Sequence, residues 1–86
     1  MKRIVSQDLD MDIPYERAVL RIPLPDVNGW FVRWSIEAIV DGKSYTLGWY
    51  LSPEDAKMVL DHIYSCARRG MEVYVMPRTN FTNEVR

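Results

Sequence analysis

The longest alternation of apolar and polar side chains runs from Trp30 to Leu51 and is interrupted once, at Asp41-Gly42. Alternation with a period of two is typical of a β-strand that is buried on one face. An Asp-Gly step between two such runs is a strong signal for a hairpin with a two-residue turn. The sequence therefore predicts a long β-hairpin whose register is set by this turn.

This register assigns every side chain of the hairpin to one of two faces. The pairs predicted on the core face are Val40 with Lys43, Ala38 with Tyr45, Ile36 with Leu47, Trp34 with Trp49, and Val32 with Leu51. The opposite face carries Phe31, Arg33, Ser35, Glu37, Ile39, Ser44, Thr46, Gly48 and Tyr50. A slip of one residue would expose two tryptophans and bury a glutamate, so we expect the register to be well specified.

Three further elements flank this hairpin. The segment Arg17–Ile22 alternates like a strand and ends at Pro23. The segment from Pro53 to Arg69 has apolar residues at helical spacing, with Ser52 as its N-cap and Gly70 as its stop. The segment Met71–Met76 is a last strand candidate, expected either parallel to the strand at 17–22 or at an edge open to another subunit.

These elements predict an α+β fold: a three-stranded antiparallel sheet with one helix packed on one face, and a fourth strand after the helix (βββαβ). We expect a single domain over residues 1–86. Residues 1–16 are predicted to be an acidic arm, residues 17–76 the core and residues 77–86 a loose tail.

Composition narrows the class of protein. The chain has 86 residues and a formal net charge of −1, so we do not expect it to bind nucleic acid over its whole surface. Its single cysteine excludes an internal disulfide and fits a reducing compartment. The start turns acidic where a signal peptide is apolar, and no run is long enough to span a membrane. We therefore expect a cytoplasmic protein that does not bind membranes.

One pair of side chains, His62 and Cys66, has the chemistry of a catalytic or metal site. His62 and Cys66 are four residues apart, so they are neighbours on one face of the predicted helix. A thiol and an imidazole at this spacing suit a nucleophile with its base, or two metal ligands. The chain has no other histidine or cysteine to complete a zinc site, and no glycine-rich phosphate loop. We expect no metal, no cofactor and no enzymatic activity.

Several short motifs together resemble a known family. They are Trp34-Ser35-Ile36-Glu37-Ala38, the Asp41-Gly42 turn, Leu47-Gly48-Trp49-Tyr50, and Ala56 with Tyr64 on the helix. The series resembles the apetala/ethylene-response-factor DNA-binding domain and the related arm-binding domain at the amino terminus of tyrosine recombinases (integrases). The resemblance covers Arg17 to Gly70. It implies that the sheet enters the major groove of DNA, with arginines of the first two strands supplying many contacts.

The sequence departs from this family at positions where DNA would be contacted. Ala38 or Ile39 replaces the family's arginine after the glutamate, Thr46 replaces its tryptophan before leucine-glycine, and the arginine-glycine-valine-arginine start is absent. The residues that we expect to contact DNA or another partner are Arg17, Arg21, Phe31, Arg33, Glu37, Ser44, Thr46 and Tyr50. Arginines beside aromatic rings suit phosphate and base contacts, although a solvated polar face is common in antiparallel sheets.

Two functions follow from these observations. The first is a small non-enzymatic DNA-binding or regulatory module that uses the exposed sheet face. The alternative is a protein-interaction module, such as a small inhibitor from a phage or mobile element, that uses the same face or a free edge strand. A homodimer through the edge strand Met71–Met76 belongs to this alternative. The net charge and the acidic arm favour the alternative, whereas the resemblance favours DNA.

Overall fold

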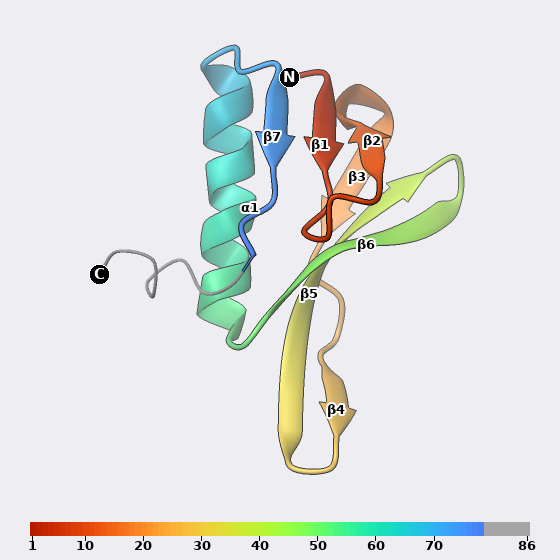
Figure 1. The fold of residues 1–86 in the computed structure, drawn as a ribbon, viewed down its shortest axis with the longest axis vertical. Helices are drawn as coiled ribbons and strands as arrows, with labels where there is room; N and C mark the ends of the chain where they lie inside the picture. Colours follow the sequence, from red (N-terminus) through yellow and green to blue (C-terminus); the bar gives the residue numbers. More distant parts are fainter. Residues whose placement is uncertain (79–86) are drawn as a thin grey trace.

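The computed structural model describes residues 1–78, which form two small β-sheets and one α-helix (Figure 1). The elements are β1 (Arg3–Val5), β2 (Asp12–Pro14), a 3-10 helix (Tyr15–Arg17), β3 (Ala18–Arg21), β4 (Asp26–Asn28), β5 (Phe31–Val40), β6 (Lys43–Tyr50), α1 (Pro53–Arg68) and β7 (Val73–Val75). The α+β class with one helix is confirmed, but the predicted strand order βββαβ is wrong in detail. The expected loose tail lies outside the described residues from position 79 onward.

The larger sheet is built around the long strand β5. Strand β6 pairs with β5 along one edge, while β3 and β4 share the other edge one after the other. Pro23 and Pro25 separate β3 from β4, and this interruption makes the sheet three strands wide at each level but four strands in number. At the β5–β6 turn, Asp41 and Gly42 both have positive φ (52° and 83°), as a type I′ turn requires.

A β-bulge in β6 changes the predicted register beyond the middle of the hairpin. Near the turn the predicted pair of Ala38 with Tyr45 is confirmed, but Ile36 pairs with Gly48 instead of Leu47. Leu47 is the extra residue, and it reverses the faces of the residues that follow. Tyr50, predicted on the exposed face, is therefore buried with 1% exposure opposite Trp34. Trp49, predicted opposite Trp34 in the core, lies on the outer face opposite Ser35.

The smaller sheet contains the segment that we expected to be an arm. Strand β1 is its central strand, antiparallel to β2 and parallel to β7. Ile4 and Ile13 are buried in the core, so residues 1–16 are part of the folded domain and the predicted arm is wrong. β7 is an edge strand as expected, but its parallel partner is β1 instead of the strand at 17–22.

Helix α1 begins at Pro53 as the sequence predicts, and it ends at Arg68, one residue before the predicted end. The Ser52 hydroxyl accepts a hydrogen bond from the Asp55 backbone N–H at 3.1 Å, and Gly70 has φ of 83° just beyond the end. The buried stripe of α1 consists of Ala56, Val59, Ile63 and Cys66. These side chains pack with residues of both sheets, so a single core joins the two sheets and the helix.

Candidate interaction surface

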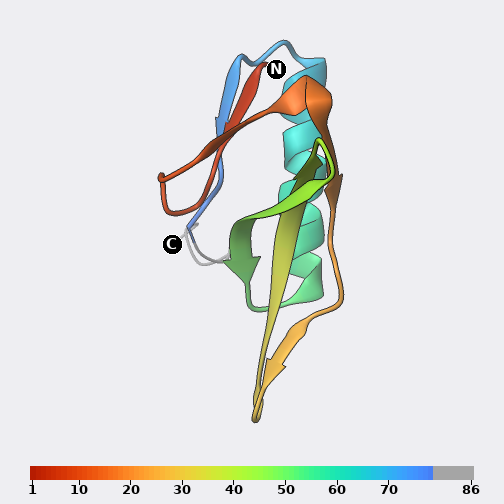
Figure 2. The same cartoon turned by 90° about the vertical axis from the view of Figure 1, so that its right-hand side faces the viewer.

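The β4–β5 hairpin projects from the body of the domain. Its strands are antiparallel, with Val27 opposite Val32 and Asp26 opposite Arg33. Gly29 begins the two-residue turn with φ of 66°, and glycine adopts this conformation without strain. The two views of the ribbon show the hairpin extending past the first turn of α1 (Figures 1 and 2). Its end is therefore not covered by the helix.

The end of this hairpin exposes large apolar side chains. Trp30 is 94% exposed and Val27 is 63% exposed, and Phe31 and Val32 are also exposed. We call these four residues the hairpin tip. No residue from 27 to 32 carries a charge. Monomeric proteins rarely gather exposed apolar side chains in one place unless the surface binds something.

The base of the hairpin is held by Arg33. Its Nη2 donates to Asp26 Oδ2 at 3.1 Å, across the two strands of the hairpin. The same guanidinium lies over the ring of Trp49 on β6, with its Cζ 4.1 Å from the ring centroid. Arg33 therefore links the projecting hairpin to the rest of the sheet by an ion pair and a cation–π contact.

The arginines predicted to read DNA are spread along the sheet, and each has a carboxylate partner. Arg17 pairs with Asp41 at 2.5 Å at the β5–β6 turn, and Arg21 pairs with Glu37 at 2.9 Å in the middle. Arg17 lies next to Ala18, which pairs with Val40 at the far end of β5. Val40 and Arg33 are seven residues apart on β5, or roughly 23 Å at about 3.3 Å per residue. The three arginines therefore do not form one basic cluster, and their charges are balanced locally.

The other predicted site residues divide between the two faces. Ser44 and Thr46 are exposed on the outer face, opposite Ile39 and Glu37. Phe31 belongs to the hairpin tip. Tyr50 is not available for contact because it is buried, and its hydroxyl donates to the Pro77 carbonyl at 3.0 Å.

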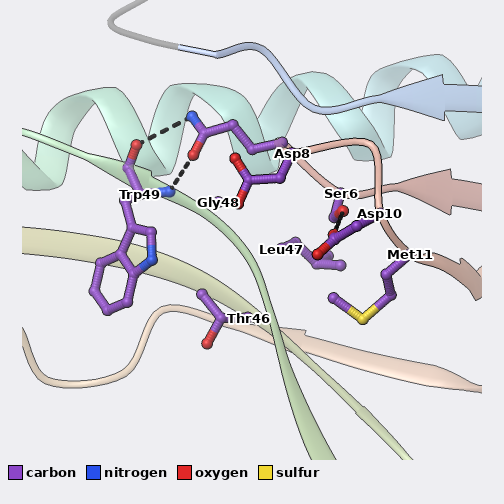
Figure 3. A pocket seen from close by; sticks show the side chains of 9 residues that line it. Ser6, Asp8, Asp10, Met11, Thr46, Leu47, Gly48 and Trp49 are labelled. Carbon is purple, nitrogen blue, oxygen red and sulfur yellow. Dashed lines mark hydrogen bonds between the residues drawn. The ribbon is translucent and has the colours of Figure 1, made fainter.

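The free side of β6 is bordered by the loop after β1. The side-chain amide of Gln7 donates to the Trp49 carbonyl at 3.2 Å and accepts from the Trp49 N–H at 2.8 Å, as a neighbouring strand would (Figure 3). Beside it lies a pocket of about 210 Å³. Its wall includes Asp8, Asp10 and Thr46, and the Ser6 hydroxyl donates to Asp10 at 2.8 Å. The two carboxylates favour a cationic group and disfavour phosphate at this end of the outer face.

His62 and Cys66 are neighbours, as the helical spacing predicts. His62 Nε2 lies 3.6 Å from Cys66 Sγ, and its Nδ1 lies 2.8 Å from the Tyr74 hydroxyl. The Cys66 side chain is buried with 2% exposure, so it offers no surface to a substrate. Burial also raises the pKa of Tyr74 to about 12. Within residues 1–78 no group of three or more potential metal-binding side chains is placed to hold an ion.

Comparison with protein families, curated proteins and solved structures finds no match for this chain. The resemblance to the DNA-binding domains named above therefore remains an expectation from short motifs. In the part of the chain that the structure describes, no helix combines the length and apolar character needed to cross a membrane.

Sequence reasoning missed Trp30 as a surface residue. The pattern from Trp30 onward was interpreted as strand, which gave its side chain a place in the sheet. The signal was present, because Asn28-Gly29 between apolar residues is itself a hairpin signal. This signal predicts a turn at Asn28-Gly29, which places Trp30 beside the end of a hairpin; in the structure the turn is one residue later, at Gly29-Trp30.

Proposed function

We propose that this chain is a small non-enzymatic module that binds another protein through its β4–β5 hairpin. The observation that supports this most strongly is the exposure of Trp30 at the end of a projecting, uncharged hairpin. Tryptophan is among the residues that most often dominate the energy of protein interfaces. Charged residues are depleted at the centre of such interfaces, which matches the composition of the hairpin tip.

Three features favour protein over DNA as the partner. The predicted arginines each have a carboxylate within 3.1 Å, so a phosphate must displace an existing partner. The hairpin tip contains no arginine or lysine to contact a phosphate, because Asp26 and Arg33, which pair with each other, lie outside it. The pocket beside Trp49 is acidic. DNA binding gains most of its affinity from basic groups that neutralise phosphates, and this surface offers few.

The proposal is tested by affinity capture from extracts of cells that express the chain. The bait is compared as wild type, Trp30→Ser and Arg21→Ser, because both substitutions are at exposed positions but only one is in the hairpin tip. We expect a protein that is retained by the wild type and by Arg21→Ser and lost with Trp30→Ser. Retention that nuclease or high salt removes, together with loss on Arg21→Ser, would support DNA binding instead.

A further inference from the structure

The exposed face of the hairpin continues the core face of the larger sheet. Val32 and Trp34 follow the same alternation along β5 as the buried Ile36, so their side chains point to the same face. Val27 is directly opposite Val32 and shares this face. Helix α1 begins at Pro53, and the β4–β5 hairpin extends past this end of the helix (Figure 1). The core face of the sheet therefore extends along the hairpin beyond the part that helix α1 covers.

We propose that a second copy of this chain supplies the missing layer. The two hairpins would pack face to face about a two-fold axis, with Val27, Trp30 and Val32 of each copy against the same residues of the other. This inference rests on the proposed function, because it names the partner of the same surface. A two-fold interface uses one self-complementary patch, and such dimers are the commonest symmetric assemblies.

The charge and shape of the hairpin fit this partner. A surface that meets its own copy must not bring like charges together, and residues 27–32 carry none. The nearest charges, Asp26 and Arg33, pair with each other on the opposite face of the ribbon. A two-stranded hairpin is marginally stable alone in water, and a second hairpin would complete a small sandwich around its apolar side chains.

The available area fits a weak, reversible dimer. A tryptophan can bury on the order of 200 Å², and Val27 and Val32 are only partly exposed, so two copies of these three residues bury at most roughly 800 Å² in total. Specific interfaces of this size are at the low end of the range and are usually transient. We therefore expect a monomer–dimer equilibrium with a dissociation constant in the micromolar range or weaker.

The test is sedimentation velocity on the purified chain from 5 μM to about 1 mM, a range chosen to span affinities typical of small interfaces. The variants are Trp30→Ser and Val27→Lys, with Val19→Lys as the matched control. Val19 and Val27 are both 63% exposed strand residues, but Val19 lies on β3, away from the hairpin. Far-ultraviolet circular dichroism checks that each variant is folded.

We expect the wild type and Val19→Lys to shift reversibly from the 10.1 kDa monomer toward a dimer as concentration rises. Trp30→Ser is expected to weaken dimerisation by at least about 30-fold, and Val27→Lys by a similar factor. A wild type that stays monomeric throughout, a loss of dimer in Val19→Lys, or open-ended association would overturn the inference. A monomeric result leaves the hairpin free for a different protein, and capture with the Trp30→Ser bait then decides the proposed function separately.

Discussion

Arg33 lies over the ring of Trp49, 4.1 Å from its centroid, and this contact joins the hairpin to β6. The contact exists because the bulge at Leu47 turns Trp49 from the core face to the outer face. The same guanidinium pairs with Asp26 at 3.1 Å, so Arg33 also bridges the two strands of the hairpin. Arg33 therefore adds side-chain contacts between the hairpin and the body of the sheet to the continuous backbone of β5.

Replacing this arginine is expected to loosen the hairpin. A cation–π contact at an exposed site contributes about 0.5–1 kcal/mol, and an exposed ion pair about 0–1 kcal/mol. We expect Arg33→Ala to lower the free energy of unfolding by about 1 kcal/mol, measured by urea denaturation. Arg17→Ala is the control, because its pair with Asp41 is more exposed and, within residues 1–78, Arg17 has no cation–π contact like that of Arg33. An equal loss in both variants would contradict the role of Trp49.

The bulge requires a residue without a side chain at position 48. A Cβ on Gly48 would lie 3.0 Å from the Tyr50 hydroxyl and 3.3 Å from the Gln7 side chain. We expect Gly48→Ala to destabilise the fold by roughly 1–3 kcal/mol, as overpacking does in well-packed sites. Gly42→Ala is the comparison for backbone strain without overpacking. Position 42 has φ of 83°, and an added Cβ there would have nothing within 4 Å. Chemical shifts of Gln7 and Trp49 that change only in Gly48→Ala would locate the effect.

Tyr50 tests the corrected register. Its ring is buried, so Tyr50→Ala is expected to cost about 3–5 kcal/mol of stability. Tyr50→Phe removes only the hydroxyl that donates to Pro77, and the Pro77 carbonyl still accepts from Gln7 at 2.8 Å. We therefore expect Tyr50→Phe to cost about 1 kcal/mol. If Tyr50 were exposed, as the uninterrupted hairpin register predicts, both substitutions would change the unfolding free energy by less than about 0.5 kcal/mol.

Alkaline pH should weaken the fold through Tyr74. Burial, and secondarily Cys66, raises the pKa of Tyr74 to about 12, whereas a tyrosine in an unfolded chain titrates near 10. The folded state holds the proton more tightly, so its contribution to stability is complete below about pH 10 and is lost as pH rises toward 12. The loss is on the order of 2 kcal/mol.

Urea denaturation between pH 9 and 12 measures this effect, with Tyr74→Phe as the comparison. We expect the decline to be shallower in Tyr74→Phe, with a remainder from Tyr64, whose pKa burial also raises. A decline of equal steepness in both proteins would show that other groups cause it.

Local signals in the sequence predicted the elements whose structure is local. The Asp41-Gly42 turn and the Ser52 cap of α1 were predicted at the right residues, because turn conformation and capping depend on a few neighbouring side chains. The bulge was not predictable in this way. The bulged segment contacts Gln7, which lies some forty residues away in the chain, and such a contact leaves no local signal.

The smaller sheet was missed for a related reason. β7 was predicted as a strand, but β1 and β2 have three residues each, which is too short for a clear alternation, and the pairing of β1 with β7 spans most of the chain. For the candidate surface, Phe31 was predicted to contact a partner and is exposed, whereas Trp30 was assigned to a strand. The periodicity of β5 extends through position 30, and periodicity alone does not reveal where the paired strand turns back.

Photo-crosslinking in cells that express the chain tests directly whether the hairpin tip binds another protein. A photoreactive phenylalanine replaces Trp30 in one variant and Ser44 in another, since Ser44 is an exposed residue of the outer face that we predicted to contact DNA. We expect discrete protein adducts from position 30, including a second copy of the chain, and none specific to position 44. Nuclease-sensitive adducts from position 44, with no protein adduct from position 30, would contradict this expectation.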